Sequence, residues 1–313
     1  MKVAVISVFY NRESVVARSA ESLLSQTCND YKICLVDDGS TDGTFDELKK
    51  FESPICEVRS SQNLGFTKQL IHTINNIDSE YIAIHGSGDI SYPERLAEQM
   101  KMLDNDPEIG VVGCNIVEDR GPELPRMEHL RHVDRDSSDR LLHENFLIHG
   151  EAMIRRSTYD QVGGYRPFFA FAQDRDLWCR ISRVSQFGNC EQVLYERTFQ
   201  DDGVAVKPKS RLAQFAFSDF AIYCHKECLA GRDDPLDRLG PAAMLLRAPS
   251  ARLTEKVIHQ SLRLLNQDQD GLAHALARAG HVYRPSMRTR IGLFALKYPF
   301  LWAWLRRIRH TNR

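Results

Sequence analysis

Acidic side chains stand at three loop ends of the chain. Asp37 and Asp38 follow the apolar run 33–36, Asp89 follows the apolar run 81–85 after a Gly-Ser-Gly turn, and Asp174 opens a helical pattern. Carboxylate oxygens suit Mg²⁺ or Mn²⁺, which keeps few protein ligands and takes the others from water and substrate phosphates. The acids therefore indicate a cation that masks the charge of a diphosphate ligand.

Structural explanations stay open for each of these acids. Asp37 or Asp38 could cap the next helix or close an Asx-turn. Residues 86–89 also fit a plain tight turn, and the helix dipole favours an acid in a first helical turn, as at Asp174. The arrangement of the rest of the chain has to decide between these interpretations.

Apolar periodicity predicts alternating strands and helices that would bring these acids together. We expect strands at residues 3–9, 32–36, 56–60, 81–85 and 109–114, and helices at residues 13–26, 44–51, 66–76 and 93–103. This alternation is typical of an α/β protein with a doubly wound, mostly parallel sheet. Because crossovers are right-handed, Tyr10-Asn11 and Asp37-Asp38 should emerge at the same sheet edge, where such folds bind ligands.

The chain beyond residue 117 mixes polar excursions with further apolar segments. Residues 118–138 are polar and carry two prolines, so we expect a mobile excursion over the site. An apolar segment at 146–155 contains His149, and Gly163-Gly164 breaks the helical pattern that precedes it. Residues 172–178 then open a helix that buries Trp178.

Strand signals vanish from about residue 207, and helical patterns replace them at residues 212–228, 242–246, 253–265 and 271–279. We therefore expect an α/β domain at 1–206 and a helical region at 207–313, on the acceptor side or in contact with a membrane. Its last stretch, from Ile291 to Arg313, combines aromatic residues with arginines. It is either a terminal helix packed on the domain, which we favour, or a peripheral membrane anchor.

Composition excludes several classes of protein. The 313 residues carry a formal net charge of -1, so there is no basic excess for binding nucleic acid. Eight scattered cysteines are typical of buried thiols in a reducing compartment. Neither a P-loop nor a Gly-x-Gly-x-x-Gly dinucleotide motif is present. We expect a cytoplasmic protein, at the inner membrane face if the anchor exists.

An ordered set of short motifs resembles a known family. The motifs are Val-Ile-Ser-Val-Phe-Tyr-Asn-Arg at 5–12, Ser-Leu-Leu-Ser-Gln-Thr at 22–27, Leu-Val-Asp-Asp-Gly-Ser-Thr-Asp-Gly-Thr at 35–44, Asn-Leu-Gly-Phe-Thr-Lys at 63–68, Gly-Asp at 88–89, Pro-Glu-Arg-Leu at 93–96, Gly-Gly-Tyr at 163–165 and Gln-Asp-Arg-Asp-Leu-Trp at 173–178. Over about residues 1–200 the sequence resembles the inverting glycosyltransferases of family 2, which have the GT-A fold.

The resemblance implies roles for individual residues. Asp89 would bind Mg²⁺ or Mn²⁺, and Asp174 would be the catalytic base. The donor-nucleotide site would comprise Val8, Tyr10, Asn11, Asp38, Lys68 and Gly88. Further contacts with donor or acceptor would come from His149, Gln173 and Trp178. The partners would be a nucleotide-diphosphate sugar and a saccharide or lipid-linked acceptor, with surface-polysaccharide assembly as the family-level expectation.

Two departures from the family pattern keep other functions open. Gly86-Ser87-Gly88-Asp89 stands where many members carry two or three acids, and Gln173 replaces the acid that often precedes the base. The thinned acid cluster motivates a catalytically silent nucleotide-sugar-binding protein as the alternative. A related nucleotidyltransferase would need a basic phosphate-gripping loop early in the chain, and Arg12 alone gives little support for one.

Overall fold

The computed structural model of the chain describes residues 1–121, 125–198, 208–265 and 270–297. It divides into two compact units, Met1–Gly203 and Val204–Arg313, and each is described by itself. The domain boundary that we predict between residues 206 and 207 lies outside the described residues, as does residue 298 onward of the predicted anchor.

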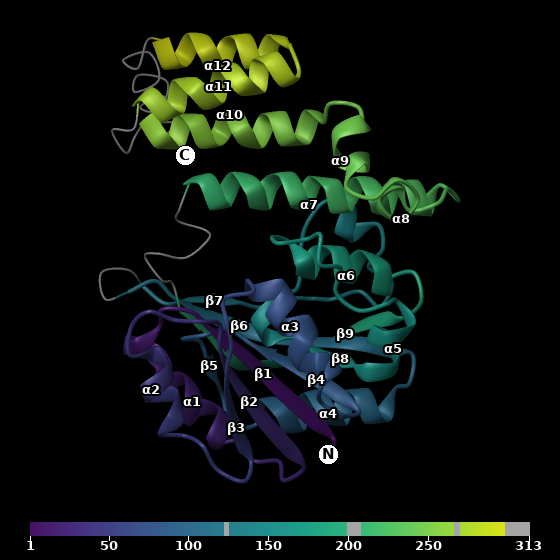
Figure 1. Ribbon diagram of the computed structural model, residues 1–313. Helices are drawn as coiled ribbons and strands as arrows, with labels where there is room; N and C mark the ends of the chain where they lie inside the picture. Colours follow the sequence, from purple (N-terminus) through teal and green to yellow (C-terminus); the bar gives the residue numbers. More distant parts are fainter. Residues whose placement is uncertain (122–124, 199–207, 266–269, 298–313) are drawn as a thin grey trace. The chain divides into compact units, whose positions relative to one another are not determined.

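A single nine-stranded sheet forms the centre of the first unit among its described residues (Figure 1). Its strand order is β3-β2-β1-β4-β8-β6-β9-β5, and β7 pairs with β6 outside this path. The strands are β1 (Val3–Phe9), β2 (Tyr31–Asp37), β3 (Cys56–Ser60), β4 (Tyr81–His85), β5 (Ile90–Ser91), β6 (Ile109–Asp119), β7 (Met127–His129), β8 (Met153–Arg155) and β9 (Gln186–Thr198).

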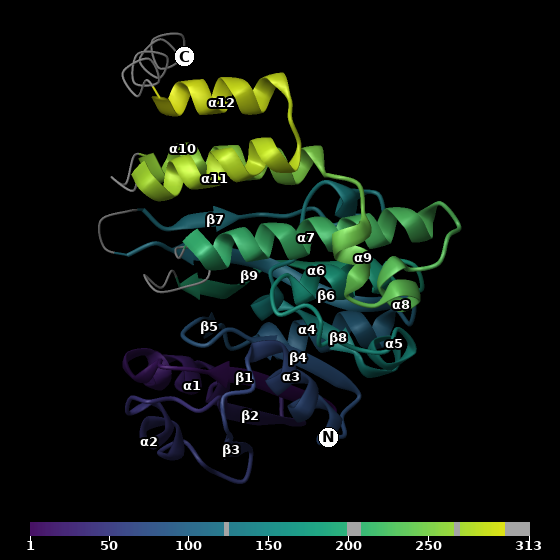
Figure 2. The ribbon, with the colours of Figure 1, turned by 45° about the horizontal axis from the view of Figure 1, so that its top comes forward.

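Helices cover both faces of this sheet. They are α1 (Val16–Leu24), α2 (Thr44–Lys49), α3 (Phe66–Asn75), α4 (Arg95–Asn105), α5 (Arg156–Gln161) and α6 (Gln173–Ile181), with 3₁₀ helices η1 (Glu13–Val15), η2 (Arg140–Leu142) and η3 (His149–Glu151). Figures 1 and 2 both place α1 and α2 beside β1–β3, and α5 beside β8. Each predicted helix of this region is present, with ends shifted by a few residues.

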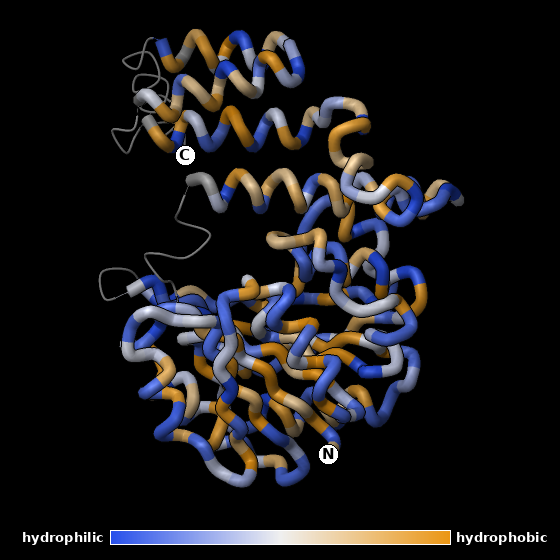
Figure 3. The backbone as a smooth tube through the Cα atoms, viewed as in Figure 1, coloured by the Kyte–Doolittle hydropathy of each residue, from blue (hydrophilic) through white to orange (hydrophobic). Residues whose placement is uncertain are grey.

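Alternation along the strands produces two apolar clusters. In β1, Val3 and Val5 belong to one cluster, while Ile6 and Val8 belong to the other. The first cluster takes residues from α1, α2 and α4, and the second takes residues from α3, α5 and α6. Figure 3 shows the central strands of this unit as largely hydrophobic. Strands buried on both faces explain why the sequence reads as continuous apolar runs there.

The two halves of the sheet differ in strand direction. β1 pairs in parallel with β2 and β4, and β2 pairs in parallel with β3. In the other half, β8 is antiparallel to both β4 and β6, and β5 is antiparallel to β9. The prediction of an α/β sheet flanked by helices is confirmed, and its parallel order holds for the half that contains β1–β4.

Two parts of the sheet differ from the sequence prediction. β9, a strand of 13 residues that runs parallel to β6, was not predicted. Polar residues interrupt the apolar alternation of this segment in the sequence, so no strand period is visible there. In the structure the strand also has register shifts against β6. The predicted mobile excursion at 118–138 is wrong in part, because β7 pairs with the end of β6 and His129 contacts Glu118.

The second unit is helical in its described part. Its helices are α7 (Pro208–Leu229), α8 (Pro235–Leu239), α9 (Ala242–Leu246), α10 (Ala251–Leu265), α11 (Asp270–Tyr283) and α12 (Met287–Lys297). The last three pack around Leu264, Ala273, Ala277 and Leu296. The helical patterns predicted for this region are confirmed. Across both units, no described helix combines the length and apolar character needed to cross a membrane.

Candidate active site

The ends of β1 and β2 are tied together at one sheet edge, as the sequence predicted. The Asp38 backbone N–H donates to the Phe9 carbonyl at 2.8 Å. The Asn11 side-chain oxygen accepts from the Thr41 N–H at 2.8 Å, and Asn11 has a φ of +52°, a conformation that asparagine tolerates. Tyr10 is 46% exposed beside this junction. The side chain of Val8 is buried in the core, so Val8 can offer only its backbone to a ligand.

The two adjacent acids after β2 have different partners. Asp37 accepts hydrogen bonds from the Ser40 N–H and the Ser60 hydroxyl, so it closes a local turn. Asp38 accepts from the N–H groups of Leu64 at 2.8 Å and Gly65 at 3.1 Å. Burial raises the pKa of Asp38 while these two donors lower it. Asp38 thereby fixes the loop that leads into α3.

The start of α3 faces a second loop of the same unit. The Thr67 hydroxyl donates to the Phe169 carbonyl at 2.8 Å, which joins the first turn of α3 to the segment that precedes α6. Lys68 lies in this same first turn and is exposed. Its ammonium is therefore available to an anion near the start of α3.

Asp89 follows β4 in a tight turn that glycine makes possible. Gly88 has a φ of +95°, and its N–H donates to the Ser19 hydroxyl at 3.2 Å. The Asp89 carboxylate accepts from the Tyr195 hydroxyl at 2.6 Å and from the Thr198 N–H at 2.9 Å. Burial raises the pKa of Asp89 to about 6, against the opposing effect of those hydrogen bonds. Asp89 is thus held from two sides by β9.

Sequence reasoning missed Tyr195 because it missed β9. The Tyr195 hydroxyl also accepts from the Gly86 N–H at 2.9 Å, so one phenol holds both ends of the turn at 86–89. The buried guanidinium of Arg95 lies 5.0 Å from the centre of the Tyr195 ring, a cation–π contact. The signal that could have revealed the strand is the run of apolar and aromatic residues at 193–195.

A divalent cation would find few protein ligands here. Among the described residues, no group of three or more His, Cys, Asp or Glu side chains is placed to hold a metal ion. Asp89 stands as a single carboxylate whose oxygens already accept hydrogen bonds. This donor set fits Mg²⁺ or Mn²⁺ that takes most of its oxygens from water and a diphosphate.

Asp174 and Asp176 lie on α6 in different surroundings. Asp174 is in the first turn and half-buried, and the Asn145 side-chain amide donates to it at 2.7 Å. Asp176 is buried and forms ion pairs with Arg166 and Arg180, the latter at 2.8 Å. Asp176 is therefore neutralised inside the protein, whereas Asp174 remains available to a ligand.

His149 packs against segments that come from both sides of the site. Its Nε2 lies 2.5 Å from the Tyr165 hydroxyl, and its Nδ1 lies 3.4 Å from the Gln173 side-chain nitrogen. Its ring meets Phe66 of α3 edge-on at 5.7 Å. Burial lowers the pKa of His149, and the charge of Asp174 acts in the opposite direction. His149, Tyr165, Gln173 and Phe66 are called the His149 cluster below.

The His149 cluster connects the surroundings of the three predicted acids. Phe66 follows Gly65, which Asp38 holds, and Gln173 precedes Asp174. A Cβ added at Gly150 would overlap the Tyr195 hydroxyl, so the residue after His149 lies directly against the group that holds Asp89.

Trp178 differs from the other predicted contact residues. It is fully buried and tilted against His149 at 6.4 Å. Its influence on a ligand would therefore pass through the His149 cluster.

The sheet has a parallel half with helices on both faces, and carboxylates follow its strands β2 and β4, as expected of a GT-A sugar transferase. The chain belongs to glycosyl transferase family 2, because the family described as "Glycosyl transferase family 2" matches residues 4–163. A relative from Bacillus subtilis, named "Putative glycosyltransferase EpsE", is 29% identical over 289 residues, which cover 87% of this chain and 98% of the relative.

Solved structures share the fold at lower sequence identity. The mannosyltransferase PcManGT from Pyrobaculum calidifontis, in complex with GDP-Man and Mn²⁺, has a TM-score of 0.57 and 18% identity, covering 97% of this chain and 82% of its own. TarS 1-349 of S. aureus, in complex with UDP-GlcNAc, has a TM-score of 0.57 and 13% identity, covering 97% and 92%. The GT-A fold predicted from the sequence is confirmed.

We predict that Gly150→Ala disturbs the site through Tyr195. The added methyl group would overlap the Tyr195 hydroxyl and lie 3.0 Å from the Gly86 nitrogen, so the tyrosine or η3 has to shift. Overpacking of this kind destabilises by about 1–3 kcal/mol. Denaturant unfolding and sugar-transfer assays should both show a loss.

The matched control is Gly271→Ala on α11, where an added Cβ meets nothing within 4 Å. It should leave stability unchanged or raise it, because alanine favours helix more than glycine does. Equal effects of the two substitutions would contradict the close packing of Gly150 on Tyr195.

Proposed function

We propose that this glycosyltransferase inverts the anomeric centre of its donor and uses Asp174 as the catalytic base. The observation that carries the proposal is the contrast on α6: Asp174 is half-buried and held by Asn145, while Asp176 is sequestered by two arginines. A general base has to reach the proton that it removes. Asp174 meets this requirement and Asp176 does not.

The proposed chemistry is a single displacement at the anomeric carbon. The acceptor hydroxyl oxygen forms a bond to that carbon as the bond to the diphosphate oxygen breaks, through a transition state with oxocarbenium character. The acceptor proton passes to the Asp174 carboxylate, and the electron pair of the broken bond leaves with the diphosphate. Asn145 keeps the carboxylate oriented through its 2.7 Å hydrogen bond.

The nucleotide side of the donor site is proposed at the ends of β1 and β2 and at the start of α3. The exposed ring of Tyr10 and the carboxylate of Asp38 border this edge, with Asn11 fixing the loop between them. The Val8 backbone, Lys68 and Gly88 complete the proposed set. Support for a nucleotide-sugar donor comes from structural relatives whose names include UDP, UDP-GlcNAc and GDP-Man.

Metal dependence is proposed through Asp89. The Mn²⁺ in the PcManGT complex supports it at the level of a shared fold. When bound, Mg²⁺ or Mn²⁺ would neutralise the charge that develops on the departing diphosphate. Tyr195 and Thr198 hold the Asp89 carboxylate in place for this role.

The acceptor is proposed to be a saccharide or lipid-linked hydroxyl, in surface-polysaccharide or glycoconjugate assembly. Peripheral membrane contact is proposed through the segment that starts at Ile291. In its described part, α12 carries Met287, Ile291 and Phe294, which are 78%, 61% and 56% exposed. Their spacing of four and three residues puts them on one side of the helix, as in helices that lie in a membrane interface.

We expect Asp174→Asn to retain donor binding and to lower turnover by roughly 10² or more, the scale of general base catalysis. Asparagine keeps the shape of the side chain but does not accept the proton. Calorimetry with the nucleotide sugar and steady-state transfer assays separate the two effects. Asp160→Asn on α5, an exposed acid paired with Arg156, is the matched control and should change neither. Donor binding without any turnover in the wild-type protein, and no effect of Asp174→Asn, would favour the catalytically silent alternative. Unchanged turnover of an active enzyme in Asp174→Asn would contradict the role of Asp174 as the base.

Asp89→Asn should weaken Mn²⁺-dependent donor binding by about tenfold or more, since a charged contact is worth about 1.5–3 kcal/mol. Binding is measured by calorimetry with Mn²⁺ and with a chelator. Asp78→Asn, an exposed acid ahead of β4, is the control. If Mn²⁺ improves donor binding equally in the wild-type protein and in Asp89→Asn, Asp89 is not the metal residue.

For α12, the double substitution Ile291→Ser/Phe294→Ser should reduce co-sedimentation with phosphatidylcholine vesicles that contain phosphatidylglycerol. The apolar side chains supply area that leaves water on insertion. Val282→Ser on α11, at a residue that is 80% exposed, is the control. Sedimentation that is the same for all three proteins would remove this proposal.

A further inference from the structure

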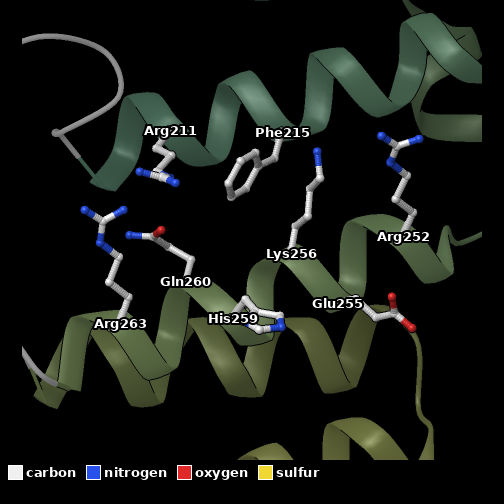
Figure 4. A pocket seen from close by; sticks show the side chains of 8 residues that line it. All are labelled: Arg211, Phe215, Arg252, Glu255, Lys256, His259, Gln260 and Arg263. Atoms are coloured by element: carbon white, nitrogen blue, oxygen red, sulfur yellow. The ribbon is translucent and has the colours of Figure 1, made fainter. Parts of the chain in front are cut away.

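A cavity of about 400 Å³ lies inside the second unit, between α7 and α10. Figure 4 shows the two helices facing each other across it. Its described lining consists of Arg211, Phe215, Arg252, Glu255, Lys256, His259, Gln260 and Arg263. The volume falls in the range of small-molecule sites, roughly 300–1,000 Å³.

Positive charge dominates this lining. Arg211 comes from α7, and Arg252, Lys256 and Arg263 come from α10. Figure 4 shows the side chains of Arg211 and Arg263 pointing toward one another from the two helices. Glu255 is the one carboxylate among the described lining residues, and it forms an ion pair with Arg288 of α12.

The cations are held close enough to affect one another. Burial and, after it, the charge of Arg263 lower the pKa of the Arg211 guanidinium. Phe215 offsets part of the repulsion, because its ring centre lies 5.6 Å from Arg211 and 5.0 Å from the Lys256 ammonium. An anion between the helices would relieve the remaining repulsion.

A plain basic helix face is the simpler explanation, and two observations count against it. On α10, Arg252, Lys256 and Arg263 are spaced by four and seven residues, which puts them on one face. That face turns toward α7, and Arg211 adds charge from the opposite side. Arg252 and Lys256 are half-buried there, and Arg263 is exposed. Gln260, in the same lining, is only 4% exposed. A solvated face would not bury its polar residues against a second helix.

We propose that this cavity binds a phosphate-bearing anion through Arg211, Arg252, Lys256 and Arg263. Guanidinium groups bind phosphate oxygens in pairs, and cations arriving from two helices suit an anion with several charged oxygens. The phosphate could belong to a soluble diphosphate or to a lipid headgroup. The proposal goes beyond the glycosyltransfer function and does not depend on the donor site.

The test uses the full-length protein and two probes. Inorganic pyrophosphate is titrated by calorimetry in the presence of a chelator, which removes metal-dependent binding at the donor site. Vesicles of phosphatidylcholine with and without phosphatidylglycerol are used in co-sedimentation. The cavity variant is Arg211→Gln/Arg263→Gln, and Arg211→Lys/Arg263→Lys retains the charge. The matched control is Arg278→Gln/Arg290→Gln, at exposed arginines of α11 and α12 outside the lining.

The cavity variant should bind pyrophosphate at least about tenfold more weakly, the lysine variant should retain part of the affinity, and the control should stay within about twofold of wild type. This outcome assigns a soluble phosphate. A phosphatidylglycerol-dependent sedimentation that only the cavity variant loses, without pyrophosphate binding, assigns a lipid headgroup.

Absence of both signals in the wild-type protein overturns the proposal. So does a loss that is equal in the cavity and control variants. Thermal unfolding verifies that each variant folds, and the lysine variant keeps the test decisive if the glutamine variant does not. Sugar transfer is measured in parallel, so failure of the cavity proposal can be told apart from failure of the proposed catalytic function.

Discussion

The parallel pairing of β1 with β2 and β4 is the constraint on which the site depends. It brings the ends of three strands that are neighbours in the sheet to the same edge, so the loops after them lie close together. The Asn11 side chain and the Asp38 N–H then join the ends of β1 and β2, and the Asp38 carboxylate holds the loop that leads into α3. The alternating apolar clusters on both faces keep these strands in register.

Much of this half could be predicted from the sequence, because its signals are local. The runs that became β1, β2 and β4 are continuous and apolar, which is what burial on both faces requires. The turn residues at 37–39 and 86–89 mark the strand ends directly. Right-handed crossover then fixes the shared edge without further information. The identity of the acids at that edge followed from the same short segments.

The other half of the site depends on contacts between residues distant in sequence. Tyr195 holds Asp89 across 106 residues, and Asn145 holds Asp174 across 29. The spacing of apolar residues along the sequence does not predict such distant partners. The strand β9 itself is interrupted by polar residues and by register shifts against β6. The His149 cluster likewise assembles from α3, η3 and α6 only after the chain has folded. The resemblance to the family suggested His149, and the folded structure shows which residues surround it.

Neighbouring residues of one type acquire different tasks through their surroundings. Asp37 closes a turn, and Asp38 holds the loop that leads into α3. On α6, Asp176 is paired with two arginines, while Asp174 is half-buried and accepts a hydrogen bond from Asn145. An ion pair buried with two guanidinium groups keeps its carboxylate from ligands, because separating the charges inside the protein costs several kcal/mol, roughly 3–5. On α6, Asp176 is held in such a pair, whereas Asp174, two residues earlier, is half-buried with a hydrogen bond from Asn145. This difference is the physical basis for proposing Asp174, and not Asp176, as the acceptor of the proton.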